Sequence, residues 1–149
     1  MKLSIFSDES FMKEALKEAQ KALEKNEVPI GAVIVSNNKI IARAHNLCET
    51  LNDATAHAEM QAITSAANFL GSKYLNECIL FITLEPCAMC ASATAWSQIG
   101  KIVYGADDDK KGFTKISQNF LHPKTEVVSG VLEKDCSEKL INFFRKKRD

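Results

Sequence analysis

The fold of this chain is decided by two short stretches, Thr55-Ala56-His57-Ala58-Glu59 and Pro86-Cys87-Ala88-Met89-Cys90. His57, Cys87 and Cys90 are residue types that bind zinc, and a Cys-x-x-Cys spacing brings both thiols to one side of a helical turn. Three protein ligands leave one coordination position for water, which is typical of a catalytic zinc site. Glu59, two residues beyond the histidine, is expected to move protons without binding the metal.

Each stretch alone is a weak signal, because His-x-Glu occurs by chance in helices and Cys-x-x-Cys also serves structural zinc sites and redox pairs. Together, in this order and with proline directly before the first cysteine, they indicate a zinc-dependent deaminase of nucleobases. The alternatives are a zinc ion that only stabilises the fold and a redox pair. A structural zinc normally has four protein ligands. The remaining thiols, Cys48, Cys78 and Cys136, are placed like ordinary buried cysteines, and we assign them no function.

Size and composition are those of one globular domain. The chain has 149 residues, of which 46% are hydrophobic and 26% charged. Its 19 basic and 19 acidic residues balance, which excludes a globally basic nucleic-acid binder but allows a local basic patch. The first ten residues lack a long apolar run, and no segment approaches the length of a membrane span. We therefore expect a cytoplasmic protein without a membrane segment.

Helical and strand patterns alternate around the two stretches. Amphipathic helices are predicted over 8–25 and 134–147, and strands over 30–35, 40–44, 78–84, 99–106 and 125–128. Asn37-Asn38 is a turn signal that makes the first two strands a hairpin. Thr55 is the expected N-cap of a helix that ends at Gly71, and Pro86 opens a shorter helix. This alternation, with its leading hairpin, predicts an α/β fold with a mixed sheet.

The last helix combines an apolar side with a basic end. Cys136, Leu140, Phe143 and Phe144 are expected to face inward. Arg145-Lys146-Lys147-Arg148 complements the negative C-terminal end of the helix dipole, which explains one or two of the charges. Four basic residues in a row also make a candidate phosphate-binding patch.

The chain resembles the cytidine-deaminase-fold superfamily, and within it the bacterial tRNA-specific adenosine deaminases. The resemblance runs nearly from end to end and is carried by residues 27–33, 44–46, 55–60, 83–90, 99–106, 130–132 and 143–145. It implies a three-layer α/β/α fold with a mixed five-stranded sheet, and a single zinc-dependent deaminase domain over residues 1–149. It also implies a homodimer with one zinc ion per chain, which converts adenosine to inosine at the wobble position of a tRNA anticodon.

The same resemblance implies roles for three more residues. Asn46 corresponds to a residue that hydrogen-bonds the substrate, Pro29 to one near the base, and Asp108 to one near the RNA backbone. The residues themselves also allow plainer interpretations. Asn46 can be a loop residue that makes local hydrogen bonds, and Asp108 can be part of a solvated charged loop.

Two features depart from the resemblance. The segment between Gly112 and Glu126 is shorter than in the family and lacks its usual Gly-Ser-Leu element, and His122-Pro123 replaces Asn-His. Trp96 resembles the tryptophan of bacterial guanine deaminases, although the favoured interpretation is an aromatic of the core or of a dimer interface. The basic end of the last helix favours a tRNA anticodon stem-loop, which is the preferred substrate. The short segment before His122 and Trp96 favour the alternative, a free base or nucleoside such as guanine. Glu59 disfavours an RNA-binding protein without enzymatic activity.

Overall fold

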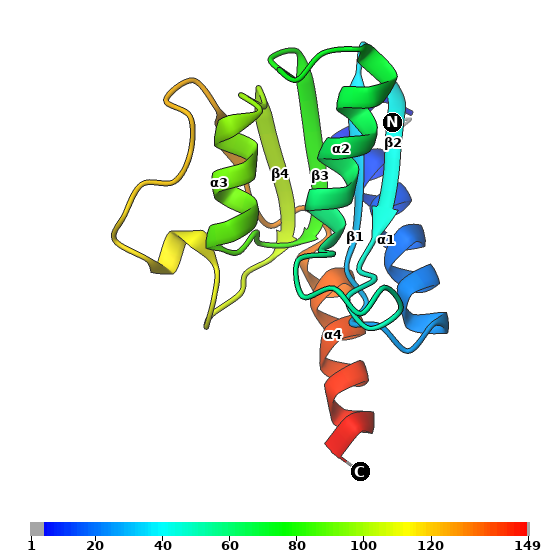
Figure 1. The fold of residues 1–149 in the computed structure, drawn as a ribbon. Helices are drawn as coiled ribbons and strands as arrows, with labels where there is room; N and C mark the ends of the chain where they lie inside the picture. Colours follow the sequence, from blue (N-terminus) through cyan, green and yellow to red (C-terminus); the bar gives the residue numbers. More distant parts are fainter. Residues whose placement is uncertain (1–4, 149) are drawn as a thin grey trace, which may run out of the picture.

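The computed structural model describes residues 5–148, which form a five-stranded sheet between two layers of helices (Figure 1). The strand order is β2-β1-β3-β4-β5; β1 pairs antiparallel with β2 and β3, whereas β4 pairs parallel with β3 and β5. The strands are β1 (Gly31–Ser36), β2 (Lys39–His45), β3 (Cys78–Leu84), β4 (Lys101–Ala106) and β5 (Glu126–Val128). The predicted α/β class and mixed sheet are confirmed.

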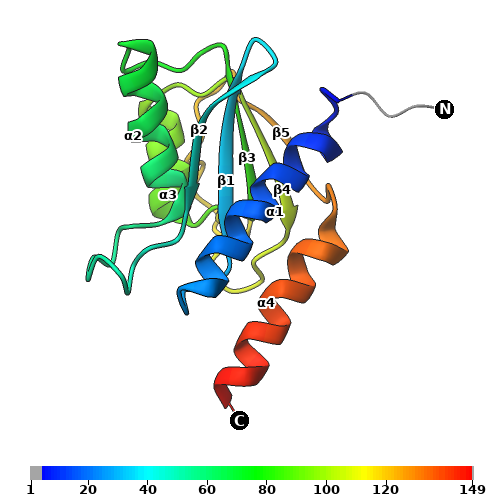
Figure 2. The same ribbon diagram turned by 90° about the vertical axis from the view of Figure 1, so that its right-hand side faces the viewer.

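Two helices cover each face of the sheet. Helices α2 (Ala58–Leu70) and α3 (Ala88–Trp96) lie on one face, and α1 (Asp8–Glu24) and α4 (Glu133–Arg148) lie on the other (Figure 2). A short 3-10 helix, η1 (Phe113–Lys115), follows β4. None of the helices within residues 5–148 is long and apolar enough to cross a membrane.

Each helical layer buries its own apolar cluster against the sheet. Leu80 and Ile102 pack on the side of α2 and α3, whereas their chain neighbours Phe81 and Val103 pack against α1 and α4. This division follows from the strand, in which successive side chains point to opposite faces. Strands β3 and β4 are therefore apolar at nearly every position, as expected for strands buried on both faces.

The hairpin between β1 and β2 forms where it was predicted. Asn37 and Asn38 both have positive φ angles, 55° and 63°. A two-residue turn of this type requires φ > 0 at both central positions, and asparagine tolerates that region better than most residues. The turn brings the end of β2, with His45 and Asn46, back alongside the start of β1 at Gly31.

The predicted N-cap of α2 was wrong by two residues. His57, with extended backbone angles, is the N-cap, and the helix begins at Ala58. Thr55 instead donates both its hydroxyl and its backbone N–H to Asp53 Oδ1, at 2.7 and 2.8 Å. That local turn satisfies Thr55 before the helix starts. At the other end Gly71 has a φ of 64° and terminates the helix as predicted.

Two aromatic side chains are exposed: Phe144, which was expected to be buried, and Trp96, which was expected in the core or at a dimer interface. In α4, Cys136, Leu140 and Phe143 are buried, but Phe144 is 47% exposed. The C-terminal half of α4 extends past the end of the sheet, so its last turns have no sheet to cover (Figure 2). Trp96, at the end of α3, is 83% exposed, which rules out a place in the core of the described chain.

Candidate active site

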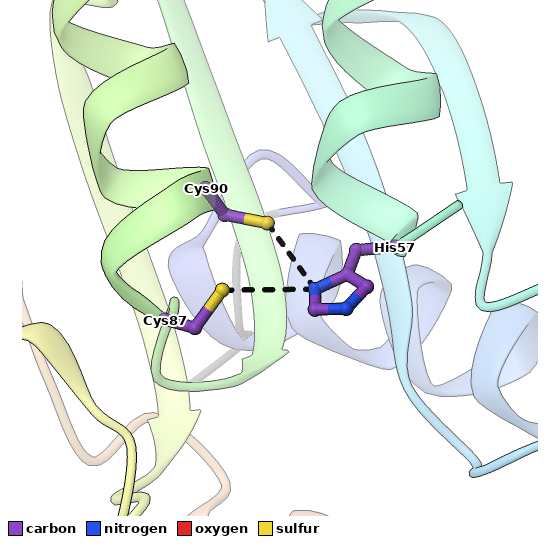
Figure 3. Close-up of side chains that lie close together, drawn as sticks. All are labelled: His57, Cys87 and Cys90. Carbon is purple, nitrogen blue, oxygen red and sulfur yellow. Dashed lines mark hydrogen bonds between the residues drawn. The ribbon is translucent and has the colours of Figure 1, made fainter. Parts of the chain in front are cut away.

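The three predicted metal ligands come together at the N-termini of two neighbouring helices. His57 is the N-cap of α2, Cys87 is the N-cap of α3, and Cys90 lies in the first turn of α3. Figure 3 shows the imidazole Nδ1 facing both sulfur atoms. Nδ1 lies 3.7 Å from Cys87 Sγ and 3.5 Å from Cys90 Sγ. Among residues 5–148, the cluster contains only these three metal-binding side chains.

The spacing of these ligand atoms fits zinc. With Zn–S and Zn–N bonds of about 2.3 and 2.05 Å, a tetrahedral angle places sulfur and nitrogen about 3.6 Å apart. The two observed separations bracket that value. Two thiols and one imidazole are also the donor atoms that zinc prefers among common metals.

Of the two cysteines, Cys87 already has a pKa that suits metal binding, whereas Cys90 must give up its proton when a metal binds. The Cys90 thiol donates a hydrogen bond to Cys87, and this bond lowers the pKa of Cys87 to about 4. Burial acts in the opposite direction but is weaker, and His57 adds to the lowering. The same contact and burial raise the pKa of Cys90. A thiolate is the form of cysteine that binds metal, and the positive end of a helix dipole stabilises it further.

Glu59 lies beside this cluster and is shielded from solvent. Its side chain is in the first turn of α2, and the residue is only 4% exposed. Burial raises the pKa of this carboxyl group to about 7, and the nearby His57 only partly counteracts the shift. A general acid and base works best when its pKa is near the working pH. Glu59 therefore lies where the sequence predicted, beside the metal cluster, and its role in proton transfer stays a prediction.

A cavity of about 900 Å³ opens onto His57 and Glu59. This volume is in the usual range for a small-molecule site. Most of the other walls come from three parts of the chain: the charged residues 107–111, the end of α4, and a pair of segments that contribute Glu27, Val28, Ile30, Asn46, Cys48 and Glu49. The residues from α4 are Leu140, Ile141, Phe144, Lys147 and Arg148. The exposure of Phe144 is thus partly explained, because its side chain borders this cavity.

Two of the three residues expected to contact substrate line the cavity. Asn46 is 6% exposed, and its backbone N–H donates to Ile30 O at 3.0 Å. Asp108 also lines it, and its carboxylate accepts the backbone N–H groups of Lys110 and Lys111. Pro29 is buried between Val28 and Ile30, which line the cavity, but is not itself part of the lining. Contact with a substrate stays a prediction for all three.

Two buried carboxylates at this site were missed in the sequence. Glu27 is fully buried and Glu85 is 2% exposed, and both accept backbone N–H groups from loops beside the cavity. A signal was present for Glu85, because an acidic residue between the end of an apolar strand and a proline has little access to solvent. Its partners were not predictable, since they lie 23 to 30 residues further along the chain.

The other cysteines and Trp96 lie apart from the metal cluster. Cys78 and Cys136 are buried in the two apolar layers. Cys48 is half-buried and lines the cavity, but its sulfur is not one of the clustered ligand atoms. Trp96 does not line the cavity. The lining of this cavity therefore gives no support to the likeness between Trp96 and the tryptophan of guanine deaminases.

Comparison with known proteins places this geometry in a family. The model of the MafB19-like deaminase family matches residues 6–148. A tRNA-specific adenosine deaminase from Bacillus subtilis is 52% identical over 146 residues, which are 95% of this chain and 91% of the relative. A solved structure from a study of A-to-I editing by tRNA:A34 deaminases at the wobble position is 44% identical, with a TM-score of 0.82. That match covers 87% of this chain and 98% of the solved one.

A guanine deaminase of known structure, also from Bacillus subtilis, is 40% identical, with a TM-score of 0.65. The match is less complete, because it covers 68% of this chain and 65% of the guanine deaminase. Three observations agree: the family match, the similarity to tRNA-specific adenosine deaminases over nearly the whole chain, and the His-Cys-Cys cluster with its buried glutamate. This chain belongs to the MafB19-like deaminase family.

Proposed function

We propose that this protein is a hydrolytic deaminase that converts adenosine to inosine at the wobble position of a tRNA anticodon, in the cytoplasm. The observation that carries this proposal is one cavity bordered by His57 and the buried Glu59 and, at its outer edge, by the basic end of α4. The similarity to tRNA-specific adenosine deaminases over nearly the whole chain supports it.

His57, Cys87 and Cys90 would hold one zinc ion, because their atoms have the types and spacing that zinc requires. When bound, zinc acts as a Lewis acid and lowers the pKa of the attacking water. The two helix N-termini that present the ligands fix their positions before the metal arrives.

The remaining chemistry falls to side chains of this protein. Glu59 accepts one proton from the attacking water and delivers it to the ring nitrogen N1. It then passes the second proton of that water, from the oxygen now bonded to C6, to the leaving amine. The C6–N bond of adenine breaks, so that adenosine and water become inosine and ammonia. The amide of Asn46 offers a donor and an acceptor for the edge of the base. Burial of Glu59 keeps bulk water from competing for this proton.

An RNA substrate must present an unstacked base, and its backbone must be held nearby. Replacing Arg145, Lys146, Lys147 and Arg148 with glutamine should weaken binding of an anticodon stem-loop, because Lys147 and Arg148 border the cavity. The slope of log K against log salt should fall by about 0.7 for each phosphate group that the variant no longer neutralises. Binding titrations across a salt series measure both effects.

A matched control removes four positive charges elsewhere, at the exposed Lys13, Lys39, Lys73 and Lys124. These residues do not line the cavity, so stem-loop binding should be nearly unchanged. Equal affinities and equal salt slopes for the two quadruple variants would contradict a role of the α4 end in RNA binding.

The second candidate is a deaminase of a free base, and the similarity to a guanine deaminase favours it. Deamination is best compared on four substrates with the same enzyme preparation: an anticodon stem-loop with a wobble adenosine, adenosine, guanine and cytosine. Turnover of the stem-loop well above that of the small substrates supports tRNA. Turnover of guanine without activity on the stem-loop would replace the proposed function with the second candidate.

We also propose a homodimer formed through the outer face of α2 and α3. Both helices start at the active-site end and run along the same face of the sheet (Figures 1 and 2). Large apolar side chains are exposed near their C-terminal ends: Phe69 is 67% exposed and Trp96 83%. Replacing Trp96 with glutamate should convert a dimer into a monomer in sedimentation equilibrium, because a buried unpaired charge opposes association. An unchanged mass would exclude Trp96 from the interface.

A further inference from the structure

We propose that Glu27 and Glu85 are positioning residues, which hold the two loops beside the active-site cavity so that Asn46 and Asp108 can receive the substrate. The 46–54 loop carries Asn46 and follows β2, and the 107–115 loop carries Asp108 and follows β4. The hydrogen bonds by themselves show that the two carboxylates hold the loops. The expected effect on substrate binding rests on the proposed function.

Glu85 gathers the 107–115 loop around one carboxylate. Its Oε1 accepts the backbone N–H of Asp108 at 3.1 Å and the ammonium of Lys115 at 2.9 Å. Its Oε2 accepts the backbone N–H of Thr114 at 2.9 Å and the hydroxyl of Thr114 at 2.6 Å. The two oxygens thus accept four hydrogen bonds from three residues, and one donor is the backbone of Asp108 itself.

The loop approaches Glu85 so closely that a glycine is required. A Cβ built on Gly112 would lie 2.2 Å from the carboxylate carbon of Glu85. Gly112 also forms a bridge with Cys87, and the N–H of Phe113 donates to Pro86 O at 2.9 Å. Glu85 therefore stands between the segment that leads to the metal ligand and the loop that carries Asp108.

Glu27 does the same for the 46–54 loop on the other side of the cavity. It is 0% exposed and also borders the cavity. One carboxylate oxygen accepts the backbone N–H of Glu49 at 3.1 Å, and the other accepts that of Thr50 at 2.6 Å. The start of the same loop is held separately by the bond from Asn46 N–H to Ile30 O.

A role in stability alone explains these contacts poorly. A buried carboxylate is costly, and well-packed apolar residues usually serve a core as well or better. Here Glu27 lines the cavity and Glu85 directly precedes Pro86-Cys87, and both bind backbone N–H groups of loops that line the cavity. Burial would raise the pKa of each group, but the hydrogen bonds outweigh burial and hold both pKa values below the usual range. In the hydrogen bonds described above, both side chains act as acceptors of backbone N–H groups.

The test uses Glu85→Gln and Glu27→Gln in the zinc-loaded full chain. Glutamine keeps the size of the side chain, but its NH2 group cannot accept a hydrogen bond, so at least one donor in each loop loses its partner. The matched control is Glu77→Gln, at the opposite end of β3, where the residue is exposed. Hydrogen exchange of single amides is measured together with kcat, KM and zinc content.

For Glu85→Gln we expect exchange at the Asp108 and Thr114 amides to accelerate roughly tenfold or more, while Glu49 and Thr50 stay protected. Glu27→Gln should give the reverse pattern. In both variants KM should rise roughly tenfold while kcat and zinc content stay within about twofold, because the reacting groups are untouched. Glu77→Gln should behave like the parent.

Milder changes keep the test decisive if Glu85→Gln does not fold. Thr114→Val and Lys115→Met each remove one side-chain donor and leave the carboxylate in place. They should raise exchange at Asp108 and the KM in the same direction by a smaller factor. A general loss of stability would instead accelerate exchange at both loops together, and that outcome would overturn the inference.

The inference is also overturned if the loop amides are released in either glutamine variant while KM stays at the parental value. The failure of the proposed function looks different. In that case the parent protein itself does not deaminate the stem-loop. Hydrogen exchange still reports on the two loops, and KM is measured on the base that the parent does deaminate.

Discussion

Replacing Glu59 with alanine is expected to lower kcat by about two to four orders of magnitude, while the protein keeps its fold and its zinc. The reason is chemical, because Glu59 is the buried carboxyl group beside the metal ligands in the cavity. Without it, no group there takes the proton from water and returns it to the leaving amine. Glu59→Gln should lose almost as much activity, since an amide keeps the shape but cannot carry the proton.

The measurement is single-turnover deamination by protein whose zinc content has been determined. The exposed Glu77→Gln serves as the control for a charge change and should retain full activity. Near-parental turnover by zinc-loaded Glu59→Ala would remove this residue from the mechanism. A loss of zinc in the variant would show instead that Glu59 supports the metal site.

Replacing Cys87 with serine is expected to lower the zinc content from one equivalent per chain to well below half, and to abolish deamination. Only three side chains in the described part of the chain can hold the ion, so the loss of one leaves too few strong donors. The melting temperature should become insensitive to added zinc, because a ligand stabilises a fold only through its own affinity.

The control is Cys48→Ser, which changes a thiol that lines the same cavity but lies outside the cluster. This variant should retain zinc. Equal zinc content in Cys87→Ser and the parent would falsify the assignment of the ligands. X-ray absorption of the parent adds a second measurement, because a fourth protein ligand in its spectrum would mean a structural zinc rather than a catalytic one.

The elements around the metal could be predicted because they depend on local rules. Short apolar runs predicted the strands, the spacing of Cys87 and Cys90 put both thiols on one helical turn, and Gly71 ended α2 where expected. The N-cap of α2 was misplaced because the hydroxyl of Thr55 can bond either a backbone N–H of the helix or the carboxylate of Asp53. Only the folded chain shows that it bonds Asp53 and leaves the cap to His57.

The exposure of Phe144 depends on where the sheet ends, and the spacing of apolar residues in a helix does not show where the sheet ends. The spacing of apolar residues in α4 continues past the point where the sheet ends, so the pattern predicted burial for a side chain that borders the cavity instead. The exposure of Trp96 could not be predicted either, because the apolar character of a side chain does not say whether it packs in the core or lies on the surface of the chain.

The sequence by itself predicted the His57-Cys87-Cys90 cluster and the class of fold, because both depend on residue types at short spacing, and the proton transfer by Glu59 stays a prediction. The tertiary structure alone decided what surrounds them. Glu27 reaches Thr50 across 23 residues, and Glu85 reaches Thr114 across 29. Such pairs join positions that no local periodicity connects, and they form only after the sheet has brought the ends of β1, β2, β3 and β4 to one side of the molecule.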